Sequence, residues 1–354
     1  MRNNPPFKLW LTMLLLLLFV APVSAGVNIF VYHRFDDVRY PSTNISGDIF
    51  SQQLEWLRAE NYQVLTLGAV VDHLRTGQSL PERCAVLTID DAFSSFYTAG
   101  LPLLKQFGFP ATLFVNTDGI GGASYMSWAQ LGEVAAAGIE IGNHSATHDY
   151  LVEKRSGEDE AQRLARIRAD LSRAQQTLRK NLGIEPKLFS YPYGEYDLQL
   201  QQLVAELGFS AAVAQQSGVV NAATDRYALP RFPMGGQYAT LRGFRDKLAM
   251  EALQVEVSSP VNPLALVNPP TLRLKITDPE VDLRRLNCYI DGSPRCAMTW
   301  EGDVGADSWL TISAATPLSG RRGKFTLTAP NRRTGRWHWF SQLWIFPVVA
   351  DGDR

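Results

Sequence analysis

Two short stretches of the sequence bring together residue types that bind metal ions. In Leu87-Thr88-Ile89-Asp90-Asp91 an apolar run ends at two adjacent carboxylates, and His144-Ser145-Ala146-Thr147-His148 places two imidazoles four residues apart. Two imidazoles and a carboxylate form a ligand set that leaves positions on a divalent metal open for water. Together the stretches predict a hydrolase with a metal-bound water. Taken alone, Asp90-Asp91 is as typical of a polar loop or a helix N-cap as it is of a functional site.

Both stretches follow predicted strands, and short apolar runs alternate with helical patterns between residues 27 and 232. We expect strands at 28–32, 63–67, 84–89, 111–115, 139–142, 187–189 and 210–214, and one more at 227–229. Such alternation, with nearly continuous apolar strands, indicates a parallel sheet. Polar residues follow several strands: His33, Asp90, Asp91, His144, the segment 191–194 and Arg231. This favours a (β/α) barrel, whose chemistry gathers at the carboxyl ends of its strands, over an open doubly wound sheet.

The C-terminal part of the chain has a different pattern. Residues 251–270 contain Ser258-Ser259-Pro260 and Asn268-Pro269-Pro270, which predict a linker. In residues 271–354, apolar and polar residues alternate in short runs, which is typical of a β-sandwich-like domain. Five of the eight Trp lie in this domain. They indicate either an aromatic platform for sugar rings or, the favoured alternative, a sandwich core and its interface with the barrel.

The three cysteines divide into a pair and a single residue. Cys288 and Cys296 flank a turn sequence and predict a disulfide across a hairpin. Cys84 lies within a predicted buried strand and is expected to be an inert core residue.

The first 25 residues have the pattern of a secretory signal peptide. Arg2 and Lys8 precede an apolar run at 9–20, and Val23-Ser24-Ala25 fits a small-residue cleavage site. We therefore expect a periplasmic or secreted protein with its barrel at 26–250 and no stable membrane span after cleavage; an uncleaved N-terminal anchor is the alternative. The net charge of −1 excludes a broad basic field for nucleic acid.

Three motifs resemble a known family. Thr88-Ile89-Asp90-Asp91, the segment 144–148 and Tyr191-Pro192-Tyr193-Gly194 are similar, in order and spacing, to the first three motifs of the polysaccharide deacetylases, carbohydrate esterase family 4 or the NodB-homology group. Val31-Tyr32-His33 resembles the branch that holds exported poly-N-acetylglucosamine deacetylases. The resemblance covers residues 27–247 and implies a distorted (β/α) barrel.

The resemblance also implies roles for individual residues. Asp91, His144 and His148 would bind a divalent metal, usually zinc, with nickel, cobalt or iron as alternatives. Asp90 would be the base that takes a proton from metal-bound water. Within the third motif, Tyr191 and Pro192 would lie at the substrate, and the backbone N–H of Tyr193 would bind the oxyanion. His33 would be the general acid that protonates the departing amine.

The chain departs from the family pattern at two positions. Ala92 follows Asp91 where the family usually has Gly, and Ser190 stands where an Arg commonly orients the base. Arg231 is our candidate to contact Asp90 in its place, with an ordinary surface Arg as the equal alternative. The late Leu-x-x-His motif of the family is absent from the sequence, which agrees with a role for His33.

The sequence thus predicts an enzyme that removes N-acetyl groups from a polysaccharide containing N-acetylglucosamine. Two alternatives remain open. One is O-deacetylation of another acetylated polysaccharide, which needs no strong general acid because an alkoxide leaves more easily than an amide anion. The other is a non-catalytic carbohydrate-binding component of polysaccharide export.

Overall fold

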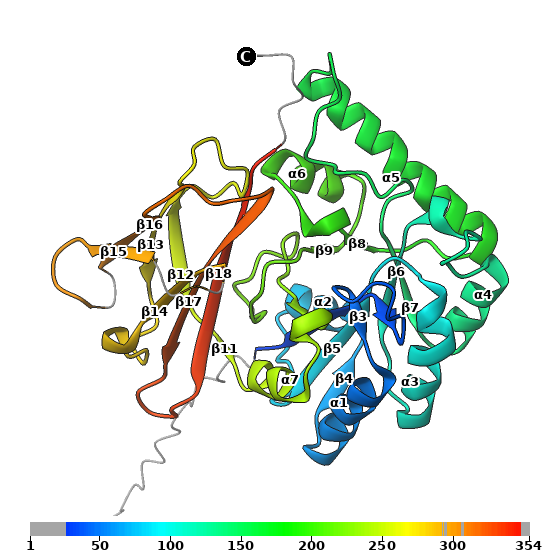
Figure 1. Ribbon diagram of the computed structural model, residues 1–354, viewed down its shortest axis with the longest axis horizontal. Coiled ribbons are helices and arrows are strands. Elements are labelled where there is room, and N and C mark those ends of the chain that lie inside the picture. Colours follow the sequence, from blue (N-terminus) through cyan, green and yellow to red (C-terminus); the bar gives the residue numbers. More distant parts are fainter. Residues whose placement is uncertain (1–25, 292, 294–295, 306–307, 348–354) are drawn as a thin grey trace, which may run out of the picture.

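The computed structural model describes residues 26–291, 293, 296–305 and 308–347 (Figure 1). The predicted signal peptide, residues 1–25, lies outside the described residues. Within the described ranges, no helix has both the length and the apolar character needed to cross a membrane.

Eight parallel strands form the larger sheet, on the right in Figure 1. Their order is β10-β1-β5-β6-β7-β8-β9, with β4 beside the first half of β5. The strands are β1 (Asn28–Tyr32), β4 (Gln63–Leu65), β5 (Cys84–Ile89), β6 (Thr112–Val115), β7 (Glu140–Asn143), β8 (Leu188–Ser190), β9 (Ala211–Val213) and β10 (Phe232–Pro233). A separate pair consists of β2 (Arg34–Phe35) and β3 (Asn44–Ile45).

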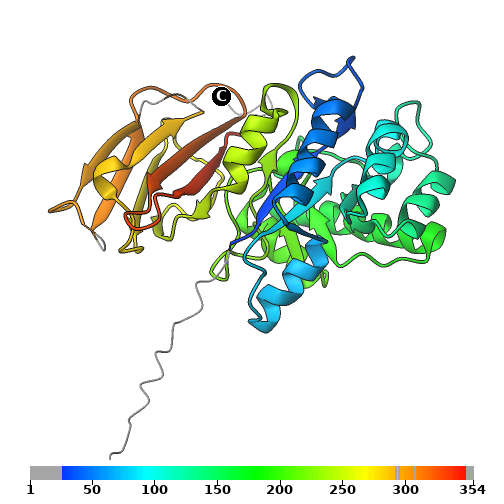
Figure 2. The same cartoon turned by 90° about the horizontal axis from the view of Figure 1, so that it is seen from below.

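Helices cover this sheet on its outer side (Figures 1 and 2). They are α1 (Gly47–Ala59), α2 (Leu67–Thr76), α3 (Leu101–Phe107), α4 (Trp128–Ala136), α5 (Glu160–Leu182), α6 (Leu198–Glu206) and α7 (Leu241–Leu248). The predicted distorted (β/α) barrel is therefore confirmed. Because β5 pairs on both edges and is covered on both faces, all six of its residues are buried, as its continuous apolar run indicates.

The barrel closes through an irregular segment rather than a full strand. Leu229 exchanges backbone hydrogen bonds with Ala212 and Ala214 around β9, and Phe232 three residues later pairs with Phe30 of β1. The predicted strand at 227–229 is wrong, because this segment changes its neighbour before a second ladder pair can form. Arg231 lies at the crossing point.

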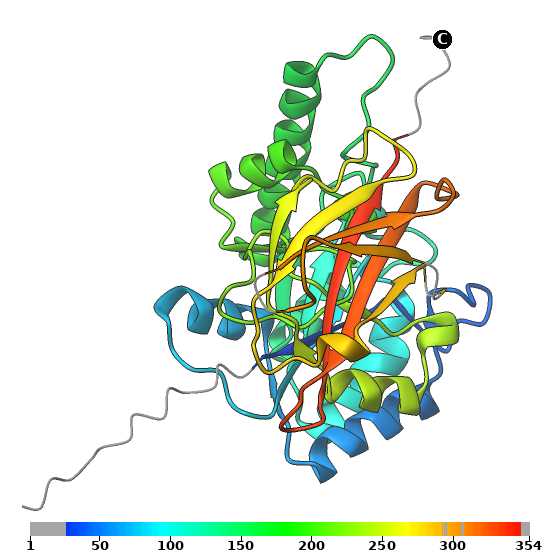
Figure 3. The same cartoon turned by 90° about the vertical axis from the view of Figure 1, so that its left-hand side faces the viewer.

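The C-terminal region forms two packed four-stranded sheets, on the left in Figure 1 and facing the viewer in Figure 3. One has the order β11-β18-β17-β14 and the other β12-β13-β16-β15. The strands are β11 (Glu251–Ala252), β12 (Val255–Ser259), β13 (Thr271–Ile276), β14 (Asn287–Ile290), β15 (Cys296–Trp300), β16 (Trp309–Ala314), β17 (Arg322–Pro330) and β18 (Trp337–Ile345). Leu274, Ile312, Leu327 and Trp344 meet in the core between the sheets, as a sandwich requires.

Two features of this region differ from the sequence predictions. Residues 251–270, predicted as a linker, contain β11 and β12, which pair with β18 and β13. The Cys288–Cys296 disulfide is present, but β14 and β15 belong to different sheets, so it joins the two sheets and does not cross a hairpin. The turn residues between the cysteines indicated a reversal of the chain and could not show that the chain also changes sheet.

Candidate active site

The carboxyl ends of β5 and β7 bring the predicted metal ligands together. Nε2 of His144 lies 3.4 Å and Nε2 of His148 lies 3.2 Å from Oδ1 of Asp91. This oxygen is buried, yet it accepts no hydrogen bond from any residue that the structure describes. Burial opposes ionisation of Asp91, but the two imidazoles outweigh it and hold the pKa of Asp91 well below its usual range. Two imidazoles around an ionised, unpaired carboxylate oxygen fit a divalent cation.

Hydrogen bonds orient the His144 ring and hold the backbone of the loop after β7. Nδ1 of His144 donates to the carbonyl oxygen of Ser190 at 2.7 Å, which leaves Nε2 free to act as a ligand. The backbone N–H of His148 donates to the Ser145 hydroxyl, and the carboxylate of Asp170 on α5 accepts from the backbone N–H of Ala146. The His144 ring and the backbone of His148 are thus held by hydrogen bonds outside the cluster.

Asp90 is held by a fully buried ion pair with Arg231. The guanidinium donates to both carboxylate oxygens, at 2.8 and 2.7 Å, and Nε of Arg231 donates to the carbonyl oxygen of Ala214 at 2.9 Å. The Ser190 hydroxyl lies within hydrogen-bond distance of both partners. Burial would raise the pKa of Asp90, but Arg231 and the nearby imidazole of His144 outweigh burial and lower it. Asp90 is therefore ionised and fixed in orientation 4.0 Å from Nε2 of His144.

Backbone strain concentrates at the same place. Of the eight described non-glycine residues with positive φ, five belong to these loops: Asp91, Ala92, Ser145, His148 and Tyr193. Left-handed backbone costs an L-residue about 1–2 kcal/mol, and such strain gathers at functional sites. Ala92 has a φ of 56°, which explains why glycine is common at this position in the family that the sequence resembles.

A cavity of about 510 Å³ opens onto the cluster, within the range of small-ligand sites. His33, which follows β1, and Tyr193 line it together with the three predicted metal ligands. Burial lowers the pKa of His33, and the carboxylates of Asp91 and Asp90 offset this only in part. The His33 ring is therefore neutral near pH 7 in the protein alone.

Two residues of the third motif lie elsewhere. Tyr191 and Pro192 are buried and are not among the residues that line the cavity. The Tyr191 hydroxyl donates to the carbonyl oxygen of Tyr227, and its ring stacks on Tyr196 in the core. Of the three residues of this motif predicted to lie at the substrate, only Tyr193 lines the cavity.

Tyr193 is oriented by a tight turn and by aromatic contacts. Its φ is 58°, and the N–H of Gly194 donates to the Tyr191 carbonyl oxygen at 2.7 Å to close the turn. The Tyr193 ring packs edge-on against His148, with a centroid distance of 4.6 Å. Burial raises the pKa of Tyr193 to about 12, so its hydroxyl stays protonated at neutral pH.

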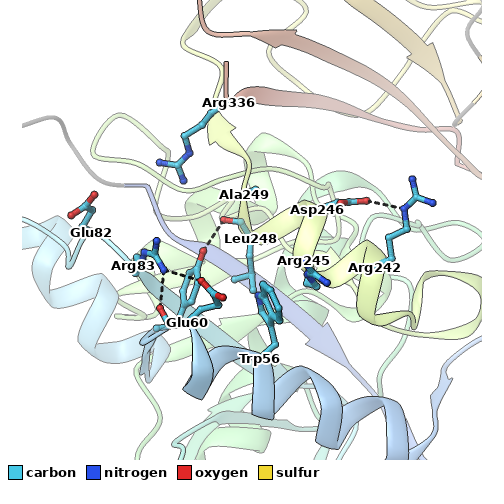
Figure 4. A pocket seen from close by; sticks show the side chains of 11 residues that line it. Trp56, Glu60, Glu82, Arg83, Arg242, Arg245, Asp246, Leu248, Ala249 and Arg336 are labelled. Atoms are coloured by element: carbon cyan, nitrogen blue, oxygen red, sulfur yellow. Dashed lines mark hydrogen bonds and ion pairs between the residues drawn. The ribbon is translucent and has the colours of Figure 1, made fainter. Parts of the chain in front are cut away.

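A larger cavity of about 710 Å³ lies at the opposite, amino-terminal end of the strands (Figure 4). Arg83 in its wall donates to Glu60, and the guanidinium of Arg245 lies 3.7 Å from the centre of the Trp56 ring. None of the predicted site residues lines it. In barrels this end contributes to stability rather than to chemistry, so we assign the chemistry to the cavity at the carboxyl ends.

The structure thus combines a distorted (β/α) barrel with an Asp–His–His group that could hold a metal ion and a second, ion-paired Asp. Residues 77–212 match the family model described as polysaccharide deacetylase. Over these residues the chain is therefore similar to the polysaccharide deacetylases.

Relatives of this domain are found in several bacteria. The chain is 27% identical over 221 residues to the poly-beta-1,6-N-acetyl-D-glucosamine N-deacetylase of Escherichia coli K12, a match to 52% of this chain and 33% of that protein. It is 26% identical over 198 residues to the enzyme of that name from Staphylococcus epidermidis, covering 53% of this chain and 67% of the relative. The structure of IcaB from Ammonifex degensii superposes with a TM-score of 0.55 at 27% identity, over 64% of this chain and 96% of that chain. This chain therefore spans a third of the length of its Escherichia coli relative.

The ligand cluster predicts a measurable affinity for metal. We expect zinc at a hundredfold excess over its dissociation constant to stabilise the apoprotein by about 2.7 kcal/mol, seen as a higher thermal midpoint. His148→Ala should remove this gain, whereas His73→Ala, on α2 and outside the cavity, should keep it. An equal zinc-induced shift in wild type and His148→Ala, with equal metal content by mass spectrometry, would exclude the cluster as the binding site.

The close packing around Gly194 predicts that a side chain at this position of the third motif would destabilise the protein. Gly194 and Gly183 both have a φ of 69°, but a Cβ on Gly194 would lie 2.4 Å from the backbone N of Gln215, whereas a Cβ on Gly183 would meet nothing within 4 Å. We expect Gly183→Ala to cost about 1–2 kcal/mol, the left-handed backbone alone, and Gly194→Ala to cost clearly more. Chemical denaturation measures both, and equal losses would contradict the close approach.

Proposed function

We propose that the protein is a metal-dependent N-deacetylase that removes acetyl groups from a polysaccharide containing N-acetylglucosamine. The observation that carries the proposal is Asp90, an ionised carboxylate fixed by Arg231 beside an Asp–His–His metal-binding cluster. The names of the relatives from Escherichia coli and Staphylococcus epidermidis supply the substrate class.

Asp90 acts as the general base. A divalent cation, when bound to Asp91, His144 and His148, lowers the pKa of water and polarises a carbonyl group. Asp90 takes the proton from the attacking water, and the bidentate ion pair supports this role because it fixes the carboxylate in one orientation. A binding module would need the three ligands but not a second, ion-paired carboxylate.

The backbone N–H of Tyr193 donates to the oxygen that becomes negative as the amide carbonyl is attacked. His33 supplies the proton for the departing amine, since an amide anion cannot leave at neutral pH. The neutral resting state of His33 is compatible with this role, because negative charge developing on the substrate raises the pKa of a nearby imidazole. The products are acetate and a free amine on the sugar.

We place this activity outside the cytoplasm, in the periplasm or the medium, because residues 1–25 have the pattern of a signal peptide. We propose zinc as the metal, since two imidazoles and one carboxylate suit it well. Nickel, cobalt and iron are the alternatives.

Acetate release from oligomers of N-acetylglucosamine, with zinc added, tests the proposal directly. We expect Asp90→Asn to lower the rate by about 10²–10⁴, the usual contribution of a general base, while it still binds metal. Asp72→Asn, on the exposed face of α2, is the matched control and should behave as wild type. Full activity of Asp90→Asn would exclude Asp90 as the base.

His33→Ala distinguishes N-deacetylation from O-deacetylation. We expect acetate release from the N-acetylated oligomer to fall at least a hundredfold, and hydrolysis of 4-nitrophenyl acetate to be nearly unchanged, because a nitrophenolate leaves without a proton. His73→Ala controls for loss of a histidine. If wild type releases acetate only from O-acetylated polymer and His33→Ala is fully active on it, the protein is an O-deacetylase.

A further inference from the structure

The β-sandwich supplies one wall of the cavity that contains the metal-binding cluster. Asp291, Arg322 and Lys324 line it from the sandwich, and Asp91 and His148 line it from the barrel. Residues more than a hundred positions apart in the sequence thus enclose the same space. A sugar chain longer than the reacting unit would have to contact this wall.

An arginine pair fixes the wall to the barrel. Arg321 donates to both carboxylate oxygens of the buried Glu195, with its nearest contact at 2.6 Å. The guanidinium of Arg321 also lies 3.9 Å from the centre of the Tyr150 ring, which stacks on Tyr193 at 3.9 Å. The neighbouring Arg322 donates to the carbonyl oxygen of Tyr193. Moving the wall away from the cluster would break a buried ion pair and the support of the Tyr193 turn.

Lys324 and Asp291 form a linked pair in this wall. The backbone N–H of Lys324 donates to Oδ1 of Asp291 at 2.8 Å, and the backbone N–H of Asp291 donates back to the Lys324 carbonyl oxygen. The Lys324 ammonium donates to the Ser217 hydroxyl at 3.1 Å. Among the described residues this is its one hydrogen bond, although an ammonium has three donors. The pair offers donors and a carboxylate acceptor, which together match the hydroxyl groups of a sugar.

The charges of the wall favour a neutral polymer over an anionic one. Arg321 is paired with Glu195 and Glu153, and Nε of Arg322 lies 3.6 Å from Glu195. The carboxylate of Asp291 accepts from the backbone N–H of Lys324 and is close enough to the Lys324 side chain to favour its charged form. The positive groups of the wall therefore have carboxylates beside them, and no excess of positive charge attracts a polyanion.

We infer, resting on the proposed function, that Lys324 and Asp291 bind hydroxyl groups of the sugars that flank the reacting unit. The neutral polysaccharide is held between the barrel and the sandwich, and the sandwich determines which chain lengths and linkages fit. Neither residue takes part in the chemical step.

The test compares a substrate that reaches the wall with one that does not. Lys324→Met and Asp291→Asn are assayed on N-acetylglucosamine oligomers of increasing length and on 4-nitrophenyl acetate, which has no sugar. Loss of a hydrogen bond to a charged group should lower kcat/KM for the longer oligomers about tenfold to a hundredfold, mainly through KM. Hydrolysis of the aryl ester should be unchanged. Lys275→Met, in β13 and paired with Glu256, is the matched control and should behave as wild type.

Three other outcomes overturn the inference. If both variants have wild-type kinetics on all oligomers, the inference is refuted but the proposed function is not. An equal loss on oligomers and aryl ester in Lys324→Met and Asp291→Asn, with unchanged thermal midpoints, would assign the pair to catalysis. If the wild type hydrolyses the aryl ester but releases no acetate from any oligomer, the proposed function fails and the inference falls with it.

Discussion

The buried ion pair between Asp90 and Arg231 is the interaction on which the rest of the site depends. Two adjacent carboxylates at the end of a buried strand repel each other, and both cannot stay ionised in an apolar surrounding without compensation. The bidentate contact with Arg231 balances the negative charge of the ionised Asp90. Asp91 is left with two imidazoles and with a carboxylate oxygen that accepts no hydrogen bond from a described residue. The ion pair therefore divides two identical side chains into one that is fixed by a guanidinium and one that can bind a cation.

The same pair explains how the chain can have Ser190 where the family that it resembles commonly has an Arg. Ser190 is small, and its hydroxyl contacts both Asp90 and Arg231, so the space that an Arg side chain would fill from β8 is filled by an Arg from the segment between β9 and β10. The carboxylate of Asp90 requires a guanidinium that donates two hydrogen bonds to it at the end of β5. Which part of the chain supplies that guanidinium matters little. The Ala214 carbonyl oxygen accepts from Nε of Arg231 and completes its hydrogen bonding.

The sequence predicts well whatever depends on local signals. The buried run of β5 and the paired imidazoles are local, so these features could be predicted within one or two residues. The contact of Arg231 with Asp90 joins residues 141 positions apart; the sequence could suggest it only by elimination, and a surface Arg was an equal alternative. The prediction of a linker at 251–270 is wrong, because Pro and Ser indicate a break in structure even where they flank edge strands. Nothing in the pattern around Lys324 could indicate the cavity, because that depends on how the sandwich packs on the barrel.

That packing follows from the way the barrel closes. Between β9 and β10 the chain changes partners at Leu229 and Phe232. Strand β18 packs on this segment. The Trp339 ring lies 5.5 Å from Phe232 and donates from Nε1 to the Ser217 carbonyl oxygen, and Leu343 and Ile345 join the core cluster of β8 and α6. The irregular segment that carries Arg231 to Asp90 is thus covered by the sandwich. The feature that makes the ion pair possible also leaves apolar surface that needs a cover, and the cover brings Lys324 and Asp291 to the cavity.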